Sequence, residues 1–211
     1  TEPRLIRTTG GLFVIGSALF ALGVLLSLPT SLPPLVAAVT YAVGAVFFTT
    51  AAACQLGLAR RDLPASPHRY LPVRERTSDW FAAAVQLVGT VLFNVATIDA
   101  ALTRHAHPEP QDQTVWTPDA AGSLAFLVSS AIALAPEIRT RRQRHRLQRT
   151  WWIAVLNLVG SILFGISAVA AYVLRDGADL SLGWANVGTF FGALCFLGAA
   201  WMFGFPRRRR M

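Results

Sequence analysis

Six long apolar stretches divide the chain, and short polar segments separate them. The stretches are residues 8–28, 35–59, 80–102, 120–135 with an extension toward 138, 151–174 and 182–205. A helix needs about 20 apolar residues to span the hydrocarbon core of a bilayer. Because a bilayer interior offers no water to unpaired backbone groups, such runs are expected to be helices. The pattern predicts an all-α polytopic membrane bundle of six transmembrane helices, in which residues 1–211 form one transmembrane domain.

Charge is scarce and lies mostly on one side of the predicted spans. Only 14% of the 211 residues are charged, against about 25% in soluble proteins. All 19 basic residues are arginine, a usage that points to a GC-rich bacterial genome. If the N-terminus is inside, every arginine except Arg104 and Arg175 falls on the inner side. The positive-inside rule therefore predicts a multi-pass protein of the bacterial inner membrane with both termini cytoplasmic.

One short pattern recurs in three of the six stretches. Residues 80–93 align without gaps on residues 151–164, and residues 15–20 carry the same kernel, [Val/Ile]-Gly-[Ser/Thr]-x-Leu-Phe. Weaker counterparts in the other three stretches are residues 44–48, 122–126 and 188–191. We therefore predict three tandem hairpin repeats, at about residues 8–59, 80–138 and 151–205. Repeats of equal orientation are related by an axis along the membrane normal, and whether they pack with three-fold symmetry stays open.

The glycines of this pattern are predicted to be contact points between helices. A glycine beside another small residue lets a neighbouring backbone approach closely. The candidates for such helix-packing notches are Gly16, Gly89, Gly160, Gly188 and Gly192. The hydroxyl that follows the kernel glycine is expected to bond back to its own helix. The alternative is that the notches line a path or a lipid groove.

The last two hairpins resemble a known family. The segments at residues 86–94 (QLVGTVLFN) and 188–196 (GTFFGALCF) are similar to the YrhK-like domain of bacterial membrane proteins. The resemblance rests on small-residue and aromatic patterns. It implies a multi-pass membrane architecture. The family has no established activity, so the resemblance implies no catalytic residue.

Amide side chains inside the stretches are the first candidates for a functional site, because polar residues in a membrane interior are costly. The candidates are Gln86, Asn94, Asn157 and Asn186, and Gln55 is a further amide. Gln86 and Asn157 occupy equivalent positions in the aligned windows, so we expect them at one depth. Asn94 lies about 12 Å further out by helical rise. These three are predicted to point into the bundle as a ladder, where they either bridge helices or line a cavity.

Two loops carry weaker chemical signals. An inner segment holds the arginines Arg139, Arg141, Arg142, Arg144, Arg146 and Arg149, which are predicted to contact anionic head groups at ~1 kcal/mol per charge. RNA binding would need aromatic residues among these arginines, so no nucleic-acid partner is expected. An outer loop holds His105, His107 and Glu109, a weak zinc or copper candidate. A solvated loop without a metal is the favoured interpretation.

Catalytic motifs do not appear in the sequence: there is no HExxH, GxGxxG or P-loop. We therefore expect no enzyme activity and no cofactor. One function is a non-catalytic membrane component: a scaffold, an assembly subunit or a lipid-interacting subunit, with a membrane-protein partner or as a homo-oligomer. The alternative is a channel or carrier for a small neutral solute or ion. A continuous polar cavity would favour the alternative, and a filled interior would favour the non-catalytic component.

Overall fold

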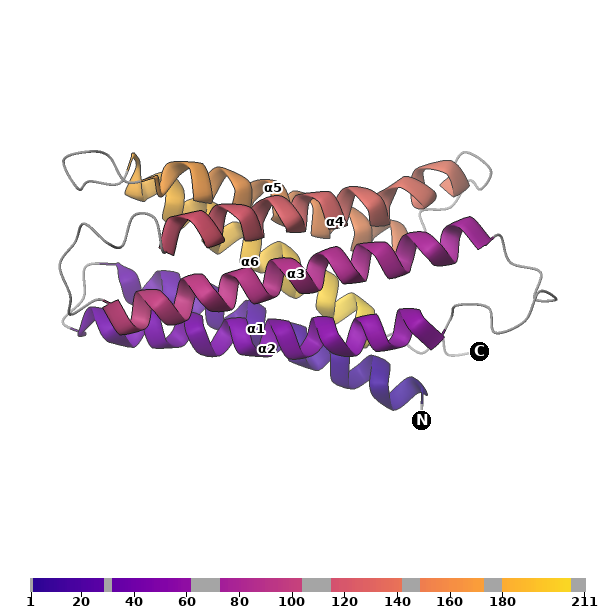
Figure 1. The fold of residues 1–211 in the computed structure, drawn as a ribbon, viewed down its shortest axis with the longest axis horizontal. Coiled ribbons are helices and arrows are strands. Elements are labelled where there is room, and N and C mark those ends of the chain that lie inside the picture. The colour runs from indigo at the N-terminus through magenta and orange to yellow at the C-terminus, as the bar shows by residue number, and fades with distance from the viewer. Residues whose placement is uncertain are drawn as a thin grey trace.

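A computed structural model describes residues 2–28, 32–61, 73–103, 115–141, 149–172 and 180–205. These residues form the helices α1 (Glu2–Ser27), α2 (Pro34–Arg61), α3 (Val73–Thr103), α4 (Thr117–Arg141), α5 (Arg149–Ala170) and α6 (Leu182–Gly204) (Figure 1). All six are long and apolar enough to cross a bilayer. The chain is therefore a multi-pass, all-α membrane protein with six candidate spans, as its apolar pattern predicts.

The six helices form a closed ring. Each helix packs against its neighbours in the chain, and α6 packs against α1. The helix axes lie roughly along the long axis of the bundle, and α1 begins at the end of the bundle where α6 ends (Figure 1). Large apolar side chains cover the outside of the ring; Leu102, Val169 and Leu124 are 73%, 63% and 61% exposed. A surface of this kind suits lipid tails, which offer no hydrogen bonds.

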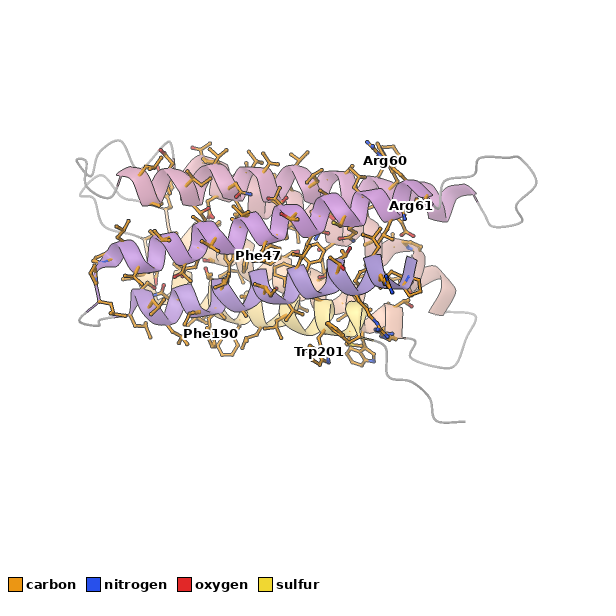
Figure 2. The ribbon with its side chains drawn as sticks, turned by 90° about the horizontal axis from the view of Figure 1, so that it is seen from below. Phe47, Arg60, Arg61, Phe190 and Trp201 are labelled. Carbon is orange, nitrogen blue, oxygen red and sulfur yellow. The ribbon has the colours of Figure 1, made fainter. Side chains whose placement is uncertain are left out.

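One end of the bundle carries the arginines of the described segments. Arg4 and Arg7 lie in the first turns of α1, and Arg60 and Arg61 lie in the last turn of α2, where Figure 2 shows them at the rim. We call this the arginine end. α3 also begins at this end, at Val73, before the predicted start at residue 80. The apolar pattern marks only the part of a helix that lies in hydrocarbon, so a polar first turn escapes it.

Glycine and phenylalanine interlock between α1 and α2. A Cβ atom added at Gly16 would lie 2.9 Å from the ring of Phe48, and one added at Gly44 would lie 2.9 Å from the ring of Phe20. Each phenylalanine therefore occupies the space that the glycine of the other helix leaves free. A larger residue at either glycine would push the two helices apart.

The same reciprocal contact joins α3 to α4 and α5 to α6. The pairs are Gly89 with Phe126, Gly122 with Phe93, Gly160 with Phe196 and Gly192 with Phe164, at 2.7, 3.4, 3.1 and 2.5 Å from the added Cβ atom to the ring. In every helix the phenylalanine follows its own glycine by one helical turn. One local pattern therefore makes a close reciprocal contact in each of the three hairpins.

The contact in α6 differs from the expected one. The sequence points to residues 188–191, whereas the interlocking residues are Gly192 and Phe196, one turn further along. Phe191 is instead 52% exposed. Gly188 lies on the same face as Gly192 and packs against α5 nearer the other end of the bundle. Because residues four apart share a helical face, spacing alone does not select between the two glycines.

Six buried phenylalanines fill the centre of the ring. They are Phe20, Phe48, Phe93, Phe126, Phe164 and Phe196, one from each helix. The rings from α1, α3 and α5 form a triangle with centroids 5.8–6.3 Å apart, and those from α2, α4 and α6 form a second, 5.5–6.2 Å apart. Each ring also lies 5.2–5.4 Å from that of its hairpin partner. We call these six rings the phenylalanine prism. Aromatic pairs at such spacings contribute ~0.5–1.5 kcal/mol beyond their burial.

Hydroxyls after the kernel glycines lie completely buried beside the prism. Ser17, Thr90 and Ser161 each lie 2.8 Å from a backbone carbonyl one turn earlier in their own helices, as expected. Ser161 also lies 2.8 Å from the hydroxyl of Ser130 on α4. Each small polar group in this layer therefore has a partner inside the bundle, which removes the cost of burying it.

Candidate functional site

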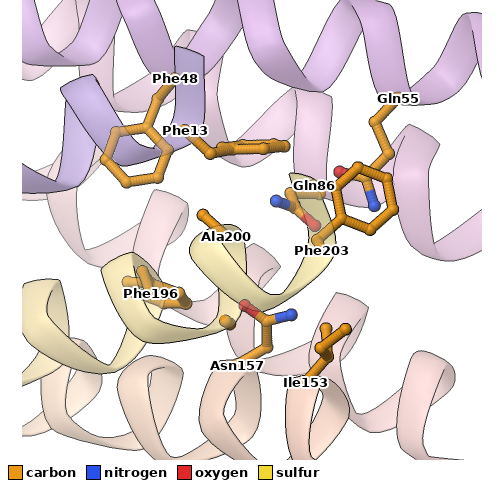
Figure 3. A pocket seen from close by; sticks show the side chains of 10 residues that line it. Phe13, Phe48, Gln55, Gln86, Ile153, Asn157, Phe196, Ala200 and Phe203 are labelled. Atoms are coloured by element: carbon orange, nitrogen blue, oxygen red, sulfur yellow. The ribbon is translucent and has the colours of Figure 1, made fainter. Parts of the chain in front are cut away.

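A small cavity lies between the phenylalanine prism and the arginine end (Figure 3). Its volume is about 50 Å³, and Phe48 and Phe196 of the prism close it on one side. The other lining residues come from α1, α2, α3, α5 and α6: Phe13, Gln55, Gln86, Ile153, Asn157, Ala199, Ala200 and Phe203. One water needs about 10–15 Å³ of such space, so the cavity has room for several waters. We call it the amide cavity.

Three amide side chains from three helices meet there. Gln55 lies on α2, Gln86 on α3 and Asn157 on α5. Figure 3 shows Gln55 and Gln86 directing their amide groups to one part of the cavity, with Asn157 reaching toward them from the opposite wall. None of the three amide groups hydrogen-bonds another residue of the described segments. Their donors and acceptors are therefore available to whatever fills the cavity.

Asn94 does not join this group. Its Nδ2 atom donates to the carbonyl of Ala45 on α2 at 3.1 Å and to the carbonyl of Thr90 at 3.0 Å, and it contacts the hydroxyl of Thr49 on α2. Asn94 therefore bridges two helices beside the prism. The predicted ladder is not formed, because eight residues of α-helix turn Asn94 about 80° away from the face of Gln86.

The third amide of the group is Gln55 and not Asn94, and it lies with Gln86 and Asn157 and not further out. It follows Gly44 at the same interval at which Phe203, also a lining residue, follows Gly192. The sequence did not reveal this equivalence of Gln55 and Phe203. The pattern in α2 is one of the weaker counterparts, and the pattern in α6 was expected one helical turn too early. The signal that could have found Gln55 is the glycine–phenylalanine spacing common to all six helices.

Ser167 and Trp116, on the far side of the prism, have hydrogen-bond partners in neighbouring helices. The hydroxyl of Ser167 donates to the carbonyl of Ala185 at 2.7 Å and lies 2.6 Å from the hydroxyl of Thr189. The indole nitrogen of Trp116 donates to the carbonyl of Ala168 at 2.8 Å. Asn186, a predicted site residue, is half-buried in the second turn of α6, far from the amide cavity.

Several predicted residues fall where no side chain is described. His105, His107 and Glu109 of the metal candidate lie outside the described residues, as do Arg142, Arg144 and Arg146; Arg139 and Arg141 belong to α4 without described side chains. Arg149 is described, and its Nη2 atom donates to the carbonyl of Phe203 at 3.4 Å. Its guanidinium therefore lies beside the wall of the amide cavity. Within the described segments no group of three metal-binding side chains occurs.

Two open, mostly apolar grooves lie on the other half of the bundle. One of about 480 Å³ runs along α4, α5 and α6 past Val169 and Trp184. The other, about 800 Å³, lies on α3 and α4 and includes Val95 and Ile98. Exposed, apolar lining of this kind suits contact with acyl chains rather than with a polar ligand.

The described lining of the amide cavity is suited to binding small molecules through hydrogen bonds. Amides donate and accept hydrogen bonds but do not transfer protons near neutral pH. The site can therefore hold small neutral groups. Comparisons of the chain with protein-family models, with curated proteins and with solved structures find no match.

Proposed function

We propose that this protein is a non-catalytic membrane component: a scaffold, an assembly subunit or a lipid-interacting subunit. The observation that carries the proposal is the phenylalanine prism, which fills the centre of the ring and closes the amide cavity on one side. A conducting protein needs a polar route across the hydrocarbon region, and at the prism the route meets six aromatic rings. The apolar outer surface and its two grooves offer contact area to lipid and to other membrane helices.

Flux through the purified protein in liposomes tests this proposal. We expect wild-type proteoliposomes to pass glycerol, urea and potassium ions no faster than protein-free liposomes. Phe48→Ala, which opens the prism, is expected to leak. Phe47→Ala on the same helix is the matched control, because Phe47 is not a prism residue. Flux through the wild-type protein would contradict the proposal.

We also propose that the bundle consists of three tandem hairpin repeats in a bacterial plasma membrane, with both termini cytoplasmic. The recurrence of one glycine–phenylalanine contact in all three hairpins supports the repeats. The arginines at one end of the described helices support the orientation. A C-terminal fusion to a reporter that is active only in the periplasm should be inactive. The likeness to the YrhK-like domain stays a prediction and adds no activity.

The arginine segment that includes Arg149 is proposed to contact anionic lipid head groups on the cytoplasmic side. Arginines next to a span attract such lipids at ~1 kcal/mol per charge. Liposomes with anionic lipid should protect residues 139–149 from protease better than neutral liposomes do. Equal cleavage in both would remove this part of the proposal.

A channel or carrier for a small neutral solute is the second candidate, and the amide cavity is the observation that favours it. Three amides that bond no other residue of the described segments face a space that extends from the arginine-end half to the prism. Transport would require the rings of Phe48 and Phe196 to move aside. The flux experiment separates the two candidates.

A further inference from the structure

We propose that the amide cavity is a hydrated binding site for one small, neutral, hydrogen-bonding molecule of the carboxamide or urea class. The molecule would enter from the arginine end and stop at the phenylalanine prism. This inference does not depend on the proposed function, since a site that binds without releasing its ligand across the membrane suits a non-transporting component equally well.

The first argument is the unmet bonding capacity of the cavity wall. Each primary amide has two N–H donors and one carbonyl acceptor with two lone pairs. Gln55, Gln86 and Asn157 spend none of this capacity on other residues of the described segments. A polar group without a partner inside a membrane protein is unfavourable, so these half-buried amides favour a cavity whose contents supply hydrogen bonds. A ligand that both donates and accepts hydrogen bonds can pair with an amide side chain more completely than a ligand that only donates or only accepts them.

The second argument concerns size. The cavity measures about 50 Å³, the space of a few waters, and two phenylalanine rings of the prism are among its lining residues. A molecule of about four non-hydrogen atoms, the size of acetamide or urea, replaces such a water cluster without displacing side chains. Larger solutes would have to move Phe13 or Phe203, which occupy the same wall.

The third argument concerns charge. The lining residues are three neutral amides and seven apolar side chains. A small ion that left water for this wall would meet no counter-charge among them. The guanidinium of Arg149, which donates to the backbone carbonyl of Phe203, further disfavours a cation. The chemistry of the wall therefore favours a neutral ligand. Chloride is the alternative, ionic ligand that the experiment tests.

The arrangement of the amides adds specificity. Gln55 and Gln86 lie on neighbouring helices, and Asn157 lies across the bundle on α5. At the position in α1 that matches Gln86 and Asn157 the chain has Phe13. The site is therefore polar on two sides and aromatic on the third. A planar amide fits such a site, with its edge on the side-chain amides and its face on a ring.

Cysteine accessibility in the full chain, reconstituted in nanodiscs, tests the proposal. Cys54→Ala and Cys195→Ala first remove the two native thiols. Gln86→Cys then reports on the cavity, and Ala96→Cys on the same helix, beyond the prism and 2% exposed, is the matched control. Because only a hydrated cysteine ionises readily to the reactive thiolate, we expect a water-soluble methanethiosulfonate to modify Gln86→Cys about tenfold faster or more.

Acetamide is the probe for the ligand. Added acetamide should slow modification of Gln86→Cys, in which Gln55 and Asn157 remain to hold it, and Asn157→Leu in the same chain should abolish that slowing. Sodium chloride at equal concentration should have no effect. Asn157→Cys serves as a second reporter if Gln86→Cys does not fold.

Three results would overturn the proposal. Modification of both reporters at the rate of Ala96→Cys would mean a dry cavity. Fast modification that acetamide does not slow would mean water only. Slowing by chloride and not by acetamide would mean an anion site.

Discussion

The amides around the cavity differ from the polar side chains at and beyond the phenylalanine prism in how they are bonded. Beyond the phenylalanine prism, Ser167 and Trp116 each donate to a carbonyl of a neighbouring helix, and at the level of the prism Asn94 does the same. On the arginine side, Gln55 and Gln86 have no such bond within the described segments. Membrane proteins usually satisfy their buried polar groups internally. Serines on the arginine side do bond between helices, as Ser129 does to the carbonyl of Ala82 at 2.7 Å. The difference is therefore confined to the amides that line the cavity, which face a space instead of a neighbouring helix.

The prism lies between the two halves and holds the six helices together. The largest loss of stability is therefore expected from substitutions at the glycines where its helices touch. Gly160→Leu places a side chain against Phe196 and the carbonyl of Gly192, both 3.0–3.1 Å from the added Cβ. Overpacking of this kind costs ~1–3 kcal/mol, and Gly89→Leu should behave alike. Thermal unfolding in detergent measures the loss. Gly165→Leu is the control on the same helix, since nothing lies within 4 Å of its Cβ position; equal melting temperatures for the three variants would refute the close contact.

Two amides on α3 test this comparison directly, because Asn94 is bonded to α2 and Gln86 faces the cavity. Asn94→Leu removes the bonds to Ala45 and Thr49 of α2 and should lower the free energy of unfolding by about 1 kcal/mol or somewhat more. Gln86→Leu removes no bond to the part of the chain that the structure describes, so its stability should stay within about 0.5 kcal/mol of wild type. Chemical or thermal denaturation of both variants in the same detergent gives the comparison. An equal loss in both would show that the cavity half is as tightly bonded as the core.

The smallest effect is expected at Thr9, in the arginine half of α1. Its side chain is fully buried, and its hydroxyl finds no hydrogen-bond partner among the described residues. Thr9→Val keeps the shape and removes the unpaired group, so we expect a gain in stability of about 1 kcal/mol or less. Thr90→Val is the matched control, because the hydroxyl of Thr90 is bonded to the carbonyl of Leu87. A loss at Thr9 like that at Thr90 would mean that the Thr9 hydroxyl has a bound partner.

Much of this architecture follows from the sequence, because the bilayer enforces it. Apolar length predicts the six helices, and the glycine in each kernel predicts where helices touch. The common depth of Gln86 and Asn157 follows from equal distances to Gly89 and Gly160. These features depend on the spacing of residues along one helix, which can be read directly from the sequence.

The remaining features depend on how helices rotate against each other. Gly188 and Gly192 fit one face equally well, and only the ring of Phe164 selects Gly192. Gln55 and Asn94 looked alike as amides in apolar spans, yet one faces the cavity and the other a neighbouring helix. Apolar periodicity cannot resolve such rotations in a membrane protein, because both the interior and the lipid-facing surface are apolar.

The closed ring also constrains how the protein is made. α1 leaves the ribosome first and α6 last, yet the two lie side by side, with the Cα atom of Gly204 2.4 Å from a Cβ atom added at Gly10. Until the third hairpin enters the membrane, Phe20 and Phe93 lack the ring of Phe164 that completes their triangle. The first four helices therefore form an incomplete ring until α5 and α6 are inserted. A chain truncated before α5 would expose its aromatic interior to lipid and to the cell's quality-control proteases.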